Sequence, residues 1–234
     1  MDINMDDWKM VDSTCATCNI KTEVLNYLHK NHPESVRCDD CLKKYEQEQE
    51  VDSEIEKMQG KNEEWKVICP PLYRETKIAH EQFPLAKWKE LSKREFSERS
   101  LILTGKTGTG KTRLMFEYLK KLYFTKNVIP TIIWVGDLSL HVLDSLKDTK
   151  AYSKLEDSWK TCSLLFIDDI FAEKCSDRVE DVLFRIIDTR TRNMLPIFAT
   201  TQREGESVIE MFQNKERAKA IVRRLREFSD GIRI

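Results

Sequence analysis

The sequence predicts an α/β fold in which a parallel five-stranded sheet is flanked by helices, with a small metal-binding module at the N-terminus. Three observations lead to this prediction. Short apolar, β-prone runs alternate with one-sided helical patterns through the second half of the chain. A glycine-rich loop follows the first of these runs and precedes a helical pattern. Two Cys-x-x-Cys pairs lie near the N-terminus.

The expected strands and helices alternate as they do in parallel sheets. Strands are expected at residues 101–104, 131–135, 164–167, 197–200 and, as the weakest run, 232–234. Residues 114–122 and 179–187 place apolar side chains at i, i+3, i+4 and i+7, which is the spacing of a one-sided helix. Strands separated by helices of this length imply crossover units on a mostly parallel sheet.

Length and charge divide the chain into parts. Its 234 residues have room for one α/β core and a smaller appendage. Residues 1–42 are expected to form the cysteine-bounded module, with a helix at 22–29. Residues 43–64 are rich in Glu, Gln and Lys and predict a solvated helical linker before the sheet domain at 65–234. Residues 1–60 carry 14 acidic and 7 basic side chains, whereas the remainder carries 26 and 32, so the two ends predict different partners.

Composition excludes several classes of protein. No apolar run approaches the ~20 residues that span a bilayer. The N-terminus, MDINMDDWKM, lacks the basic-then-apolar order of a secretory signal. We therefore expect a cytoplasmic protein with no membrane partner. Seven cysteines in such a chain favour metal ligands or buried thiols over a disulfide framework.

The glycine-rich loop matches the phosphate-binding P-loop pattern in the strand-to-helix context that the motif requires. Its glycines allow the backbone N–H groups and the helix N-terminus to face oxyanions. Lys111 then reaches the β- and γ-phosphates, and the Thr112 hydroxyl binds Mg²⁺. A turn that matches the motif by chance is the alternative, and eight residues in register argue against it. The predicted nucleotide-binding residues are Gly105, Lys106, Thr107, Gly108, Thr109, Gly110, Lys111 and Thr112.

Two carboxylates end the expected strand at 164–167. Asp168 is predicted to hold Mg²⁺ together with Thr112, and Asp169 to orient or deprotonate the attacking water. A strand that passes into an Asx turn is the alternative for the pair taken alone. Asp169 is one methylene shorter than glutamate, which predicts slow hydrolysis. The nucleotide is expected to be ATP, because the only forward Asn-Lys of the GTPase pattern, at 214–215, lacks the final carboxylate.

The cysteine pairs have the spacing of a four-thiolate zinc site, with Cys15, Cys18, Cys38 and Cys41 as ligands. A unit of about 30 residues has little core, so bound Zn²⁺ would supply stability. Reducible thiols are the alternative, and His29 or His32 could replace a cysteine. Because the module is acidic, it suits a protein partner better than a phosphate backbone.

Two basic stretches are the better candidates for DNA contact, although a solvated helix face is the commoner explanation for each. They are the lysines and arginines at 87–99 and the cluster at 217–226.

Residues 101–112, 164–169, 195–202 and 221–225 together resemble the DnaC/IstB/DnaI-type AAA+ ATPases, which load replicative helicases or assist transposases. The resemblance covers about residues 65–234 and implies a P-loop fold of the ASCE/AAA+ class without a C-terminal lid. It implies that Thr201 or Gln202 senses the γ-phosphate. It also implies that Arg224 is an arginine finger acting on a neighbouring subunit, with Arg223, Arg226, Arg190 and Arg192 as competitors.

The resemblance implies an ATP-hydrolysing, helicase-loader-like factor in DNA replication, slow by itself and stimulated by DNA or a partner. Its expected cofactors are ATP, Mg²⁺ and Zn²⁺. Its expected partners are single-stranded DNA, a replicative helicase or another replication protein, and further copies of itself in an ATP-dependent oligomer. Two alternatives stay open: a transposition-associated ATPase that assembles on DNA, and a nucleotide-gated adaptor with little hydrolysis.

Overall fold

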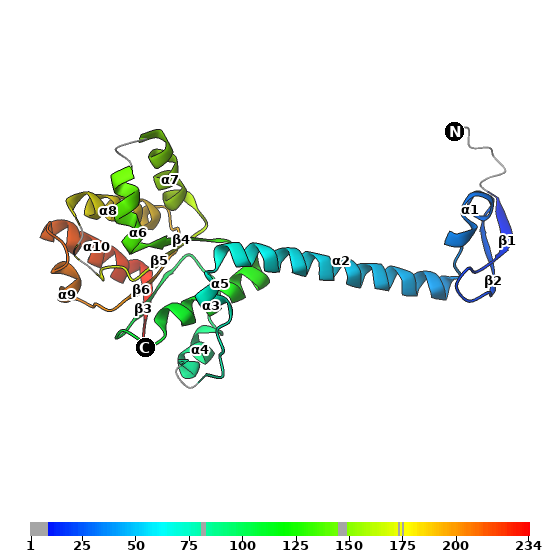
Figure 1. The fold of residues 1–234 in the computed structure, drawn as a ribbon, viewed down its shortest axis with the longest axis horizontal. Coiled ribbons are helices and arrows are strands. Elements are labelled where there is room, and N and C mark those ends of the chain that lie inside the picture. The colour runs from blue at the N-terminus through cyan, green and yellow to red at the C-terminus, as the bar shows by residue number, and fades with distance from the viewer. Residues whose placement is uncertain (1–8, 81–82, 145–148, 173, 175) are drawn as a thin grey trace. The chain divides into compact units, whose positions relative to one another are not determined.

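The computed structural model describes residues 9–80, 83–144, 149–172, 174 and 176–234, and the chain forms two units, Met1–Glu63 and Glu64–Ile234 (Figure 1). The first eight residues of the predicted module therefore lie outside the described part. No helix in the described ranges is long and apolar enough to cross a membrane.

The first unit is built on a hairpin. Strands β1 (Met10–Thr14) and β2 (Lys21–Leu25) pair antiparallel, with Met10 opposite Leu25. The short helices α1 (Asn26–Asn31) and η2 (Pro33–Ser35) follow. The helix predicted at 22–29 is therefore wrong in its first half. The β-branched Thr22 and Val24 pair across the hairpin, and the helix begins only after the ladder ends.

Helix α2 (Asp39–Ile68) is longer at both ends than the predicted linker. It begins between the cysteines of the second pair, so Cys41 lies in its first turn. Its last residues belong to the second unit, where Trp65 is buried with its ring 5.5 Å from that of Tyr123. The helix ends before Cys69-Pro70, where the proline disfavours helical backbone in the preceding residue.

The second unit contains the five-stranded parallel sheet that the sequence predicts. The strand order is β4–β5–β6–β3–β7, and every neighbouring pair is parallel. The strands are β3 (Ser100–Thr104), β4 (Pro130–Trp134), β5 (Leu164–Asp168), β6 (Ile197–Thr201) and β7 (Ser229–Arg233).

The fifth strand begins three residues earlier than its apolar run suggests. Ser229, Asp230 and Gly231 carry no apolar signal, but they pair with β3 at the edge of the sheet. Asp230 accepts hydrogen bonds from Arg94 (2.9 Å) and Arg99 (2.8 Å), so two ion pairs hold this edge strand.

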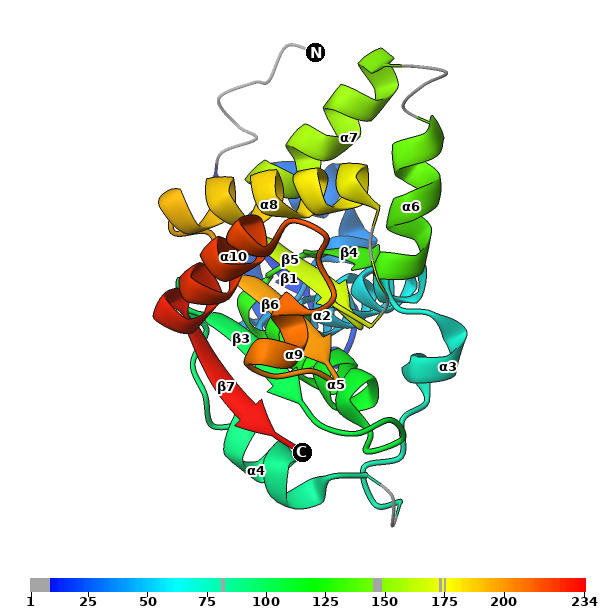
Figure 2. The same ribbon diagram turned by 90° about the vertical axis from the view of Figure 1, so that its left-hand side faces the viewer.

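Helices cover both faces of the sheet (Figure 2). One face packs against α5 (Lys111–Lys126), α4 (Leu85–Leu91), α3 (Pro71–Arg74) and the end of α2. The other packs against α6 (Val135–Asp144), α7 (Thr149–Thr161), α8 (Asp177–Arg192), α9 (Glu206–Ile209) and α10 (Lys215–Phe228).

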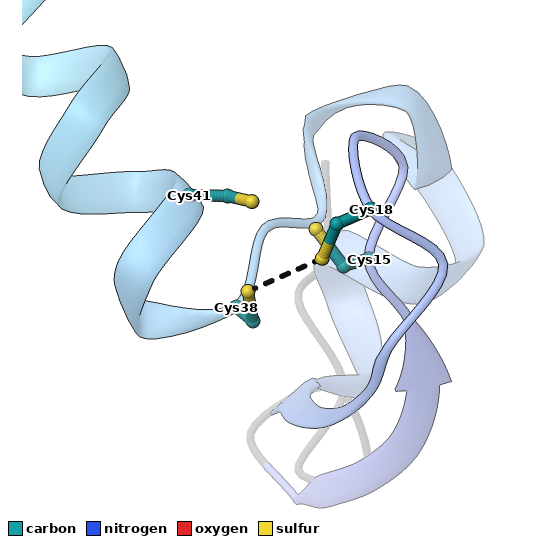
Figure 3. Close-up of side chains that lie close together, drawn as sticks. All are labelled: Cys15, Cys18, Cys38 and Cys41. Atoms are coloured by element: carbon teal, nitrogen blue, oxygen red, sulfur yellow. Dashed lines mark hydrogen bonds between the residues drawn. The ribbon is translucent and has the colours of Figure 1, made fainter.

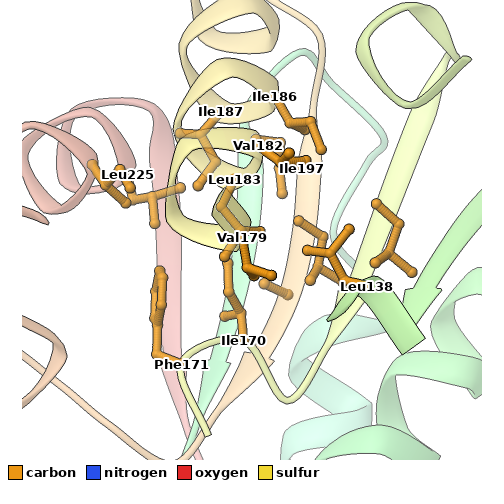
Figure 4. Packing of buried hydrophobic residues seen from close by; sticks show 14 of the residues in the cluster. Leu138, Ile170, Phe171, Val179, Val182, Leu183, Ile186, Ile187, Ile197 and Leu225 are labelled. Atoms are coloured by element: carbon orange, nitrogen blue, oxygen red, sulfur yellow. The ribbon is translucent and has the colours of Figure 1, made fainter. Parts of the chain in front are cut away.

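Strand β5, which lies between β4 and β6, is buried throughout and contributes side chains to both hydrophobic clusters. Leu164 and Phe166 join the cluster under α5, whereas Leu165 and Ile167 join the one under α8. This alternation is the period of two that places successive side chains on opposite faces. On α8, the predicted apolar positions from Val179 to Ile187 all point into the second cluster (Figure 4).

Arg190 on α8 holds three chain segments together from inside the core. Its side chain is fully buried and donates to the carbonyl oxygens of Trp159 (2.9 Å), Cys162 (2.9 Å) and Pro196 (2.8 Å). These bonds join the end of α7 to the segments that enter β5 and β6. Arg190 therefore has a structural role and is removed from the arginine-finger candidates.

Replacing Arg190 by leucine is expected to lower the free energy of unfolding by about 3 kcal/mol, because buried carbonyl oxygens lose their donors. Urea unfolding followed by circular dichroism measures this change. Arg192→Leu is the matched control on the same helix, since Arg192 is exposed and, among the described residues, pairs only with Asp188. Its effect should stay below about 0.5 kcal/mol, and equal losses in the two variants would contradict the assignment.

Candidate nucleotide-binding site

The loop between β3 and α5 has the backbone that phosphate binding requires. Gly105, Gly108 and Gly110 have φ angles of 155°, 81° and 85°, which side chains rarely tolerate. A Cβ atom at Gly105 would also collide with the backbone carbonyl oxygen of Ile234. Helix α5 begins at Lys111, so its free N–H groups face the loop.

Lys111 folds back into its own loop. Its Nζ donates to the carbonyl oxygens of Gly105 (3.0 Å) and Lys106 (2.9 Å). Burial lowers the pKa of Lys111, while Asp169 and Asp168 act against this shift. A bound phosphate would offer the ammonium group a charged partner in place of the two carbonyl oxygens.

Asp168 stands at the centre of a hydrogen-bonded group at the carboxyl edge of the sheet. Its Oδ1 accepts from the hydroxyls of Thr112 (2.9 Å) and Thr200 (2.6 Å). Burial raises the pKa of Asp168, although both hydroxyl bonds oppose that effect. A hydroxyl and a carboxylate oxygen side by side are ligands that Mg²⁺ accepts, so Thr112 and Asp168 fit the predicted metal site.

Thr200 was not predicted to take part in this group. Its hydroxyl also accepts from the backbone N–H of Asp169 (2.8 Å), so it links β6 to both carboxylate residues. The sequence showed that Thr200 lies near the end of an apolar strand. It did not show that β6 lies beside β5, and this strand order is what brings Thr200 to Asp168.

Asp169 lies at the cavity beside the phosphate loop. Its φ of 53° is left-handed, a conformation that aspartate tolerates better than most residues. Asp169 lines a cavity that the phosphate loop also lines. The volume of this cavity is about 500 Å³.

The two sensor candidates separate in the structure. Gln202 lines this cavity, and its Oε1 accepts from the hydroxyl of Thr107 in the phosphate loop (2.7 Å). Thr201 is buried, and its hydroxyl accepts from the backbone N–H of Arg203 (3.1 Å). Thr201 lines a separate apolar cavity under α10. Of the two, Gln202 alone has its side chain at the nucleotide loop.

The opposite wall of the cavity comes from the segment between α3 and α4, which the sequence did not single out. This wall is formed by Glu75, Thr76, Lys77, His80 and Phe83. The segment has no glycine motif or charge pattern, so sequence alone carried no signal for it. It offers aromatic and polar groups for the part of a nucleotide beyond the phosphates.

The side chain of Arg224 already has partners within its own chain. Its guanidinium forms an ion pair with Asp188 on α8 and lies 5.2 Å from the centre of the Phe184 ring. Arg223 and Arg226 are exposed and have no partner within the described ranges. Both line a groove beside Gly205 and Val222.

Ion pairs also neutralise most of the basic stretches that were considered for DNA. Besides Arg94 and Arg99, which bind Asp230, Lys87 pairs with Glu90. In the second stretch, Arg217 pairs with Asp181 and Lys219 with Glu216.

The four predicted cysteines converge in the first unit (Figure 3). Their sulfur atoms all lie within 4.8 Å of one another. Tetrahedral zinc–thiolate bonds require sulfur separations of about 3.8 Å, so the cluster fits one metal ion. The backbone N–H of Cys38 lowers the pKa of the Cys15 thiol to about 6. Cys15 can therefore supply a thiolate of the kind that metals bind.

The two histidines considered as ligands lie outside the cluster. His29 hydrogen-bonds to Ser13 (2.9 Å), and His32 lies 3.6 Å from Glu34.

Solved structures of replication proteins have the same fold as this chain. DnaI is 25% identical, with a TM-score of 0.56 over 68% of this chain and 88% of its own. The DnaC helicase loader is 18% identical, with a TM-score of 0.59 over 70% and 99%. AMPPCP-bound DnaA from Aquifex aeolicus is 20% identical, with a TM-score of 0.53 over 70% of this chain and 50% of that protein. No protein-family model and no curated protein matches the chain.

These similarities confirm the predicted resemblance to DnaC and DnaI and the P-loop AAA+ fold. The fold is one that binds nucleotide, as the AMPPCP complex of DnaA illustrates.

Protein purified under reducing conditions is expected to contain about one Zn²⁺ per chain, because four thiolates close one tetrahedral site. Elemental analysis measures this content. Cys15→Ser should lose the metal and unfold the first unit while ATP binding by the second unit persists. Cys69→Ala is the control, since Cys69 is buried outside the cluster. Metal-free wild-type protein would refute the zinc assignment.

Proposed function

We propose that this chain is an ATP-binding and ATP-hydrolysing AAA+ factor of DNA replication that acts like a helicase loader. The observation that carries the proposal is the convergence of Thr112, Thr200 and Asp168 beside a phosphate loop. The fold that holds this site matches 88% of DnaI and 99% of the DnaC loader.

Different residues at this site would bind different parts of the nucleotide and its metal ion. The loop N–H groups and the N-terminus of α5 bind phosphate oxygens, and Lys111 leaves the loop carbonyls for the β- and γ-phosphates. Thr112 and Asp168 hold Mg²⁺, which neutralises phosphate charge when bound. Asp169 orients the attacking water, and Gln202 contacts the γ-phosphate from the loop side.

Hydrolysis is expected to be slow in the isolated chain. Asp169 has a shorter side chain than glutamate, and no arginine lines the described cavity except Arg113. Arginines that neutralise transition-state charge raise phosphoryl-transfer rates by about 10³–10⁵-fold. A second copy of the chain would supply the missing group across an ATP-dependent interface.

Arg223 is better placed than Arg224 to be that group. The ion pair with Asp188 and the contact with Phe184 would have to break before Arg224 reached another chain. Arg223 is exposed beside Arg226, and it has no such contacts to break among the described residues. We therefore propose Arg223, rather than Arg224, as the arginine finger.

The cysteine module is proposed to hold one structural Zn²⁺ and to bind a protein partner such as a replicative helicase. Its ligand set is complete with four thiolates, so no open coordination position is implied. Single-stranded DNA remains the proposed nucleic-acid partner of the assembled oligomer. The short carboxylate of Asp169 also supports a second candidate, a nucleotide-gated adaptor with little hydrolysis.

Two variants are expected to separate binding from hydrolysis. Lys111→Ala should abolish ATP binding in calorimetry, because the phosphates lose the only lysine of the loop that folds inward. Asp169→Asn should bind ATP as the wild type does but lose turnover. Unchanged binding in the first variant would overturn the proposed function. Negligible turnover of the wild type with DNA and partner present would favour the adaptor.

Arg223→Ala is expected to bind ATP normally and to lose about 10³-fold in hydrolysis, because only the transition state needs its charge. Mixing this variant with Lys111→Ala should restore partial activity, since an intact loop and an intact arginine then meet at one interface. Arg224→Ala is the adjacent control and should retain turnover. Loss and rescue in Arg224→Ala alone would return the finger role to Arg224.

A further inference from the structure

Tyr73 on α3 is held in an aromatic stack at the carboxyl edge of the sheet. Its ring lies 4.7 Å from that of Phe116, with only 9° between their planes. On the same side it is nearly parallel to Trp134, at 6.2 Å and 13°. Three stacked rings leave the phenol ring little freedom to turn, so the Tyr73 ring is held in place.

The two rings beneath Tyr73 belong to the neighbours of the candidate metal ligands. Phe116 follows Thr112 by four residues on α5, so both side chains lie on one face of that helix. Trp134 is the residue of β4 that pairs in register with Asp168 of β5. Tyr73 is therefore bracketed by the elements that present Thr112 and Asp168.

A second set of contacts fixes α3 to the start of α5. Arg113, the residue after Thr112, donates to the carbonyl oxygen of Leu72 (3.0 Å), and its guanidinium lies 5.7 Å from the centre of the Tyr73 ring. The hydroxyl of Thr76 donates to the carbonyl oxygen of Tyr73 (2.9 Å). These contacts attach the backbone around Tyr73 to the start of α5, directly after the phosphate loop.

The Tyr73 hydroxyl has no hydrogen-bond partner within the described ranges, although the side chain is half-buried. Burial raises the pKa of Tyr73, and the charge of Asp168 raises it further, as does that of Asp169. The phenol therefore keeps its proton at neutral pH and lies within the electrostatic reach of both carboxylates. Among the described residues, neither carboxylate forms a hydrogen bond with it.

We propose that the Tyr73 hydroxyl is a positioning group of the nucleotide site, hydrogen-bonded to a water molecule on the Mg²⁺ that Thr112 and Asp168 hold. The inference rests on the proposed function, because it assumes that Mg²⁺ binds with ATP. Mg²⁺ usually keeps several of its waters in proteins, and those waters need oriented partners. A hydroxyl suits this place because it accepts from a metal-bound water and donates toward a carboxylate.

Tyr73→Phe in the full chain tests the proposal, because it removes the hydroxyl and keeps the aromatic stack. Binding of a fluorescent ATP analogue is titrated with Mg²⁺ and measured separately in EDTA. The variant should need about tenfold more Mg²⁺ for half-maximal binding, which is the size of effect typical of outer-shell partners. Its affinity for the analogue in EDTA should equal that of the wild type.

Tyr152→Phe is the matched control, since Tyr152 lies on α7 against Trp159 and packs on the opposite face of the sheet from Tyr73. It should leave the Mg²⁺ midpoint unchanged. A Tyr73→Phe midpoint equal to that of the wild type would overturn the proposal, and so would an equal loss of binding in EDTA. In either case, Mg²⁺-dependent binding by the wild type would leave the proposed function standing. Wild-type protein that binds no analogue with Mg²⁺ would overturn both.

Discussion

The functional edge of this sheet depends on one carboxylate oxygen. Oδ1 of Asp168 accepts hydrogen bonds from Thr112 on α5 and Thr200 on β6, so three elements meet at a single buried atom. A buried carboxylate is costly unless it is hydrogen-bonded, and here both partners are hydroxyls, of which Thr112 lines the cavity beside the phosphate loop and Thr200 is fully buried. The same bonds that satisfy Asp168 therefore fix the distance between the helix after the phosphate loop and the strand that carries Asp168.

Charge pairing within the second unit decides which basic groups remain available to a partner. Arg94 and Arg99 hold the edge strand through Asp230, and Arg190 holds the interior through carbonyl oxygens. Arg224 is held by Asp188. These side chains already have partners, and using them elsewhere would require breaking those contacts. Arg223 and Arg226 are exposed and have no partner among the described residues. These two arginines of α10 could therefore contact another molecule without breaking an existing ion pair.

The cysteine cluster and the nucleotide cavity belong to different units and obey different constraints. Among its described residues, the first unit buries few apolar side chains, of which Val36 is one. The second unit has two full hydrophobic clusters, one on each face of the sheet. Packing therefore orders the cavity beside the phosphate loop, whereas the proposed Zn²⁺ would supply stability that the small core of the first unit lacks.

Sequence by itself determined the features that depend on local spacing. The five strands, the phosphate loop, Asp168 and the four cysteines follow from periodicity or from fixed intervals along the chain, because neighbours in sequence decide them. Only the tertiary structure decided the features that depend on distant residues. Strand order brought Thr200 to Asp168, the packing of α10 on α8 brought Arg224 to Asp188, and the position of α3 brought Tyr73 against Phe116. These contacts join residues 30 or more positions apart, and no periodic pattern records them.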